Sequence, residues 1–171
     1  MRKIYLLMFA LMLCFSMANA QVIEGTVLKS WDGASGSIEI PANVTEIADN
    51  CFYSPAEEDP DTWEVIGEEK SNTNITNIKL NNVKKIGKNA FKGCSNIESI
   101  DAPNVEIVGD EAFARCEKLA TLALPNIKNV GVDAFQGCEQ LKEIALGKSL
   151  TTIYSCSCKQ QLPWAGTEIQ D

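Results

Sequence analysis

Apolar residues recur along the middle of this chain with a fixed period of 22 residues. Three consecutive windows align without a gap: ITNIKLNNVKKIGKNAFKGCSN, IESIDAPNVEIVGDEAFARCEK and LATLALPNIKNVGVDAFQGCEQ. In each window, a set of apolar columns leads into the motif Gly-x-x-Ala-Phe. A fixed period of roughly 20 to 50 residues is typical of stacked supersecondary units, so the pattern predicts a repeat solenoid.

Within one repeat, the hydrophobic pattern predicts two extended segments and a tight turn. Ile78 and Leu80 alternate with polar neighbours, as in a short strand with one buried face. Val83 and Ile86 predict a second extended segment. Gly87 predicts a backbone conformation that other residues avoid, and the Asn-Ala-Phe after it predicts a brief helical turn. Stacking aligns identical columns, so we expect a mainly β coil stack with short helical turns and about five units of 22–23 residues.

Two columns of side chains are expected to lie in the core of this stack. Full burial of each large apolar side chain stabilises the folded state by roughly 1.5 to 3 kcal/mol. A buried free thiol behaves as a small apolar group. Equivalent cysteines on parallel coils point the same way, which disfavours a disulfide, because that bond needs its β-carbons turned toward each other. The predicted ladder comprises Phe52, Phe91, Phe113, Phe135, Cys94, Cys116 and Cys138.

The repeat continues with less regular spacing on both sides of the three windows. We therefore expect an N-terminal capping segment over residues 21–36, the solenoid over residues 37–153 and a C-terminal cap or tail over residues 154–171. Within the tail, Cys156 and Cys158 are candidates for reactive or disulfide-forming thiols.

One stretch, residues 54–74, interrupts the period, since Leu80 follows Ile40 by 40 residues instead of 22 or 23. A solvated excursion is one interpretation. The other is a recognition loop, because long insertions tend to carry function and an exposed tryptophan is a common interface anchor. Calcium is a further alternative for its carboxylates, but no Asp-x-Asp-x-Asp-Gly spacing is present. The loop candidates are Trp63, Glu57, Glu58, Asp59 and Asp61.

The first 20 residues have the pattern of a secretory signal. Met-Arg-Lys precedes an apolar run, and small residues follow up to Ala20, so cleavage after that alanine is expected. A lipoprotein signal ending at Cys14 is the alternative, but Leu13 is bulky where that motif requires a small residue. The apolar run is too short to cross roughly 30 Å of hydrocarbon. We therefore expect a secreted or cell-surface protein with no membrane span.

Charge and composition exclude several classes of function. The chain has 15 Lys and Arg against 23 Asp and Glu, a net charge of −8, which disfavours nucleic-acid binding because that begins with neutralising phosphates. It has no histidine, the usual general base and a common zinc ligand. Asp110 and Glu111 could be read as a glycosidase pair, but the pattern places them on the polar side of a turn with no pocket. We expect no enzyme, no metal, no cofactor and no small-molecule substrate.

The repeats, with the core IG-x-x-AF-x-GC-x-x-L and the strand exit LPN-[VI], resemble the BspA-like leucine-rich repeat family over roughly Ser37 to Ile153. This resemblance implies a right-handed leucine-rich-repeat coil stack in a secreted or surface protein that adheres to or binds host or partner proteins. It does not imply catalysis. The segment before the first repeat also resembles the first segment of the family, in which a hairpin including Trp31 caps the stack.

These patterns together favour a protein-binding or adhesion module. Outward side chains of stacked parallel strands form continuous rows, and we expect a protein partner, from a host or from the extracellular matrix. A structural or accessory fragment of a surface assembly, with no ligand of its own, is the alternative. The candidate binding face comprises Ser37, Glu39, Asn77, Lys79, Ser99, Asp101, Thr121 and Glu143, with Ala123 and Ala145 completing the rows.

Overall fold

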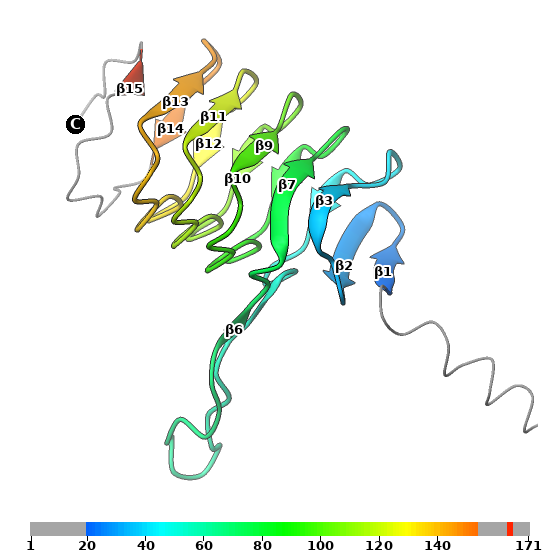
Figure 1. The fold of residues 1–171 in the computed structure, drawn as a ribbon, viewed down its shortest axis with the longest axis vertical. Coiled ribbons are helices and arrows are strands. Elements are labelled where there is room, and N and C mark those ends of the chain that lie inside the picture. Colours follow the sequence, from blue (N-terminus) through cyan, green and yellow to red (C-terminus); the bar gives the residue numbers. More distant parts are fainter. Residues whose placement is uncertain (1–19, 154–163, 166–171) are drawn as a thin grey trace, which may run out of the picture.

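The long strands of successive coils form one parallel sheet. In the computed structural model, which describes residues 20–153 and 164–165, this sheet has the strand order β15-β13-β11-β9-β7-β3 (Figure 1). From β3 to β13, each pairing joins equivalent positions of neighbouring coils. We call it the long-strand sheet, and its members are β3 (Gly36–Glu39), β7 (Ile75–Lys79), β9 (Ser99–Asp101), β11 (Thr121–Leu124), β13 (Glu143–Leu146) and β15 (Trp164–Ala165).

A second sheet, the short-strand sheet, follows another side of the coils in the order β1-β2-β4-β8-β10-β12-β14. From β4 to β12, the second residue of each strand is an isoleucine or valine that is buried. The two sheets make a β-solenoid of about five turns, so the predicted fold class is confirmed. The members of the short-strand sheet are β1 (Gln21–Glu24), β2 (Val27–Trp31), β4 (Glu46–Ile47), β8 (Lys85–Ile86), β10 (Ile107–Val108), β12 (Asn129–Val130) and β14 (Thr152–Ile153).

Apolar columns from consecutive coils fill the interior of the solenoid, and the phenylalanine column is the largest of them. The rings of Phe52 and Phe91 have centroids 4.9 Å apart, and the next two steps, to Phe113 and then to Phe135, are 5.3 Å and 5.7 Å. Phe91 and Phe113 are fully buried. Each coil supplies only one ring to the column, so burial of that ring depends on the neighbouring coils.

The turn that carries the phenylalanine differs from the sequence-based expectation. We expected a brief helical turn at Asn-Ala-Phe, but residues 20–153 and 164–165 contain no helix. Asn89 adopts a left-handed φ of 53°, which ends helical dihedral angles. Its amide and that of Phe91 donate to the next coil, to the carbonyls of Asp110 at 2.9 Å and Ala112 at 2.8 Å. At these two amides, hydrogen bonds to the next coil take the place of bonds within a helix.

The described part of the chain also contains no helix long and apolar enough to cross a membrane.

The repeated glycine has a different role from the one expected. The sequence suggested that Gly87 and its equivalents adopt a conformation unfavourable for other residues, yet none of them has a positive φ. They are close-approach positions: a Cβ at Gly87 would lie 2.5 Å from the amide nitrogen of Asp49, and one at Gly109 would lie 2.8 Å from the carbonyl carbon of Gly87. The left-handed conformation occurs two residues later, at Asn89, Glu111 and Asp133.

The coil interrupted by residues 54–74 keeps its place in the stack. β3 pairs directly with β7, with Ile38 opposite Ile78. The inserted chain leaves and returns through the antiparallel strands β5 (Tyr53–Ser54) and β6 (Lys70–Ser71), and it projects away from the stack (Figure 1). We call residues 54–71 the arm. At the N-terminal end of the stack, the antiparallel β1–β2 hairpin extends the short-strand sheet through the pairing of β2 with β4.

Candidate functional site

The long-strand sheet brings the candidate binding-face residues into two straight rows. In the first row, strand pairing places Ser37, Asn77, Ser99, Thr121 and Glu143 opposite one another. The second row, two residues along each strand, contains Glu39, Lys79, Asp101, Ala123 and Ala145. Residues of both rows from β3, β7 and β9 line a shallow hollow of about 440 Å³.

Hydrogen bonds between strands order the start of the first row. The Asn77 side-chain amide donates to the Ser37 hydroxyl at 3.2 Å, and the Ser99 hydroxyl donates to Asn77 Oδ1 at 2.6 Å. These side chains therefore hold defined orientations on an exposed surface, which lowers the entropy cost of contacting a partner.

The second row changes character along the stack. Its first three members are Glu39, Lys79 and Asp101, so opposite charges alternate on neighbouring strands. The next two members are alanines, and the adjoining hollow of about 290 Å³ is lined by them together with Thr121 and Glu143. The face is thus charged and hydrogen-bonding at β3–β9 and more apolar at β11–β13.

The arm is a hairpin with an ordered tip. Beyond the β5–β6 pair, Glu58 and Val65 form an isolated antiparallel bridge. The Asp59 carboxylate closes the tip by accepting hydrogen bonds from the amides of Asp61 at 2.8 Å and Thr62 at 3.0 Å. Because these amides stabilise the carboxylate form, the pKa of Asp59 is lowered.

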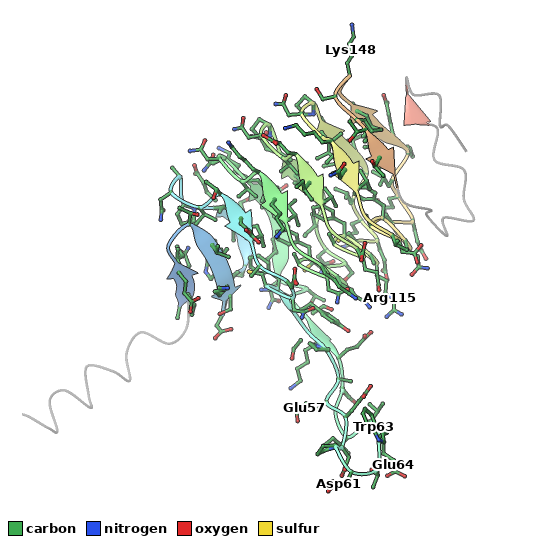
Figure 2. The ribbon with its side chains drawn as sticks, turned by 180° about the vertical axis from the view of Figure 1, so that it is seen from behind. Glu57, Asp61, Trp63, Glu64, Arg115 and Lys148 are labelled. Carbon is green, nitrogen blue, oxygen red and sulfur yellow. The ribbon has the colours of Figure 1, made fainter. Side chains whose placement is uncertain are left out.

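The candidate loop residues lie on the arm and apart from the rows. Trp63 has an exposed fraction of 78%, and Glu57, Glu58 and Asp61 are exposed as well. Figure 2 shows Trp63 with Asp61 and Glu64 at the far end of the arm, away from the coil stack. The structure therefore separates the two sets of sequence-predicted residues into two surfaces.

A polar network fixes the base of the arm, and sequence reasoning missed it. Glu69 accepts a hydrogen bond from the Tyr53 hydroxyl at 2.8 Å and pairs with the Arg115 guanidinium at 2.7 Å. Lys92 lies 5.2 Å from the Tyr53 ring centroid and pairs with Glu111 at 2.7 Å. The hydrogen bond from Tyr53, and then the nearby cations, lower the pKa of Glu69. Burial, followed by the hydrogen bond to Glu69, raises the pKa of Tyr53 to about 12.

One sequence signal for this network exists in the repeat alignment. Arg115 occupies the column in which the neighbouring coils have Gly93 and Gly137, and all three residues adopt a left-handed φ. An arginine at a position that favours glycine is a local departure from the repeat, and departures of this kind concentrate at functional positions.

The cysteine column lies in the core. Cys94 and Cys116 are fully buried, Cys138 is 8% exposed, and all three thiols are free. Cys116 donates to the Phe91 carbonyl at 3.3 Å, and Cys138 donates to the Phe113 carbonyl at 3.1 Å. Burial raises the pKa of Cys94 and Cys138 to about 12 and that of Cys116 well above its ordinary value. The terminal pair Cys156 and Cys158 lies outside the described residues, as do residues 1–19 of the expected signal segment.

Asp110 and Glu111, which in the sequence could be read as a glycosidase pair, make structural contacts. Asp110 accepts a hydrogen bond from the amide of Val132 on the next coil at 2.9 Å. Glu111 pairs with Lys92 and adopts a left-handed φ of 51°. Both side chains thus connect neighbouring coils.

The parallel coil stack and its repeated motif define a leucine-rich-repeat protein. The family model described as "BspA type Leucine rich repeat region (6 copies)" matches residues 67–163, more than half of the chain. The chain belongs to this family.

Three solved structures share the fold. A leucine-rich repeat protein of T. pallidum has a TM-score of 0.59 and 20% identity, and the match covers 82% of this chain and 61% of that one. A leucine-rich repeat protein from Bacteroides ovatus ATCC 8483 has a TM-score of 0.59 and 24% identity, over 79% and 35% of the two chains. A leucine-rich cell surface protein from Faecalibacterium prausnitzii A2-165 has a TM-score of 0.51 and 22% identity, over 81% and 43%.

At these identities the likeness establishes the fold alone. This chain spans less than two thirds of the length of each of these proteins. A comparison with curated proteins gives no significant match.

Proposed function

We propose that this chain is a secreted or cell-surface module that binds a protein partner through its long-strand sheet. The observation that carries the proposal is the pair of in-register rows, whose first members are ordered by hydrogen bonds around a hollow of about 440 Å³. A stack of parallel strands presents such rows as a broad, regular surface, and that form suits the surface of another protein better than it suits a small molecule.

Two further facts support an exported location for the module. The first 20 residues have the charged, apolar and small-residue order of a secretory signal. One of the three structurally similar proteins is described as a cell surface protein. A partner from a host or from the extracellular matrix, and a role in adhesion, are part of this proposal.

The test is a binding assay of the purified chain against a panel of purified cell-surface and extracellular-matrix proteins. Ser99→Arg with Thr121→Arg places two bulky charges on the first row, and we expect affinity for the partner to fall at least about tenfold, equivalent to about 1.4 kcal/mol. The matched control is Glu117→Arg with Glu139→Arg, two exposed positions on the turn side of the coils.

Equal loss of binding in the row variant and the control would contradict a specific site on the long-strand sheet. Absence of binding to any protein in the panel would favour the accessory role, in which the coils serve a larger surface assembly. Circular dichroism of each variant confirms that the comparison is made between folded proteins.

A further inference from the structure

The arm presents an apolar cluster that the fold leaves uncovered. Six large apolar side chains are exposed among the described residues, and three of them lie within four consecutive positions at the tip of the arm. Trp63, Val65 and Ile66 have exposed fractions of 78%, 64% and 61%. A two-stranded hairpin has no second layer that could bury them, and clustered exposed apolar side chains mark protein-contact sites.

Contacts at both ends of the arm give it a defined conformation. Its base is held by the contacts of Glu69 with Tyr53 and Arg115, and its tip is closed by the Asp59 carboxylate. Trp63 adopts a left-handed φ of 59°, unusual for a bulky residue, and its amide donates to the Asp59 carbonyl at 2.8 Å. Strained residues held by their surroundings concentrate at binding sites, and a preordered element binds with a smaller entropy cost.

Charge decides which occupant the apolar cluster suits. Residues 54–71 contain seven carboxylates and one lysine, and among the residues that the structure describes only Glu69 of these carboxylates pairs with a cation of the coil stack. A second copy of this chain, with a net charge of −8, would be repelled, and an anionic lipid surface would be repelled for the same reason. A cationic protein surface is attracted, and a recess in it would bury Trp63.

We propose that the arm is a second docking element that takes a cationic segment of a partner protein, with Trp63 as the apolar anchor and the surrounding carboxylates as the contacts for lysine and arginine. This assignment rests on the proposed protein-binding function and adds a contact on the arm to the one on the strand rows. The arm and the rows would then contact a partner at two separated places, which raises overall affinity when both engage together.

The test uses a display library of short random peptides, selected for binding to the full chain. We expect enriched peptides to combine lysine or arginine with an aromatic or aliphatic residue. Their affinity should fall about thirtyfold in Trp63→Ala, the scale of an interface hot spot. The triple variant Glu57→Gln, Glu58→Gln and Asp61→Asn should bind them more weakly and with a flatter dependence on salt.

Two matched controls use exposed residues of the coils. Val132→Ala removes an exposed apolar side chain, and Glu98→Gln, Glu117→Gln and Glu139→Gln together remove three exposed carboxylates. Both should bind the selected peptides like the unsubstituted chain. All substituted side chains are solvent-exposed, so an unchanged thermal transition is expected throughout.

Three outcomes would overturn the assignment: no enrichment of peptides, enriched peptides without basic residues, or peptides that bind Trp63→Ala as tightly as the unsubstituted chain. Peptides that lose affinity for Ser99→Arg with Thr121→Arg, but not for Trp63→Ala, would support the strand rows while rejecting the arm. Failure of the arm and failure of the proposed function are therefore distinguishable.

Discussion

At the scale of single residues, the repeat alignment identifies which positions are constrained but not always why. The asparagine that follows proline at the strand exits APN and LPN illustrates this. Asn104 and Asn126 donate side-chain hydrogen bonds to the carbonyls of Asn81 at 2.7 Å and Pro103 at 2.8 Å, each on the preceding coil. The reason for the recurrence is a contact between coils, and such contacts are not visible in the pattern of a single coil.

The first prediction concerns the close-approach glycine. Gly109→Ala places a methyl group against the backbone of the preceding coil, and we expect a loss of about 1 to 3 kcal/mol in the free energy of unfolding. Gly67→Ala is the control, because a Cβ there meets its nearest neighbour, the Glu57 amide nitrogen, at an ordinary 3.4 Å. That variant should change stability by less than about 1 kcal/mol. Urea denaturation measures both, and equal losses would contradict the close-approach role.

A second prediction concerns the reactivity of the thiols. Cys94, Cys116 and Cys138 are buried with raised pKa values, so little reactive thiolate is present in the folded protein at neutral pH. We expect these cysteines to resist alkylation until the chain is unfolded by denaturant, as followed by mass spectrometry of peptides. Rapid labelling of Cys116 in the native protein would contradict the register of the middle coil.

The same pKa shifts predict lower stability in alkali. The pKa of Cys94 and of Cys138 is about 12 in the folded protein against an ordinary 9.0, so each thiol ionises first in the unfolded chain. The stabilisation from burying the neutral thiol is complete below pH 9 and is lost as the pH rises toward 12. The loss approaches about 1.4 kcal/mol per thiol for each pH unit. Denaturation at several pH values should show a shallower decline for Cys94→Ala, and an identical decline would contradict the assignment.

At the scale of elements, the coil was predictable and the arm was not. The period-two alternation of Ile78 and Leu80 and the apolar Val83 and Ile86 identified both strands, because burial of one face dictates the pattern. The insertion was located by counting residues, but its hairpin form was not, since an element that buries almost nothing has no hydrophobic period. Its anchor, Arg115, lies 46 residues from Glu69, beyond the reach of local sequence reasoning.

The next prediction concerns Arg115, the residue of the coil stack that anchors the arm. Arg115→Gly removes the ion pair with Glu69, and it also places glycine at a position where the backbone φ is left-handed. Loss of an exposed ion pair destabilises the fold by roughly 0.2 to 1 kcal/mol. Relief of the left-handed strain offsets this by a similar amount, so the free energy of unfolding should change by less than about 1 kcal/mol. Arm mobility should nevertheless increase, measured as faster hydrogen exchange and proteolysis within residues 54–71. Arg115→Lys, which retains the charge, is the control.

Acid should have the same effect as Arg115→Gly on the arm. The pKa of Glu69 is lowered, so its contacts persist through the usual range of glutamate titration and are lost only as the pH falls through the lowered value. At neutral pH, equal rates of hydrogen exchange in the arm of Arg115→Gly and in that of the unsubstituted chain would show that this network does not hold the base of the arm.

At the scale of the whole molecule, the coils are coupled mainly to their immediate neighbours. Backbone hydrogen bonds such as that from Phe91 to Ala112, the asparagine contacts and the ring stacking join one coil to the next. In such a stack, stability is a sum of coil terms and nearest-neighbour interfaces, so damage in the middle separates two halves whereas damage at an end shortens the stack.

The phenylalanine column provides the test of this coupling. Phe113 has a stacked ring on each side, at 5.3 Å and 5.7 Å, whereas Phe52 ends the column with one neighbour at 4.9 Å. Phe113→Ala should leave a cavity between two coils and cost roughly 3 to 5 kcal/mol, and the unfolding transition should broaden as the two halves uncouple. Phe52→Ala should cost less and leave the transition sharp, because only the first coil loosens. Chemical denaturation followed by circular dichroism measures both free energies and both slopes. A loss below about 1 kcal/mol at Phe113, or a larger loss at Phe52, would mean that the rings do not act as one continuous buried column.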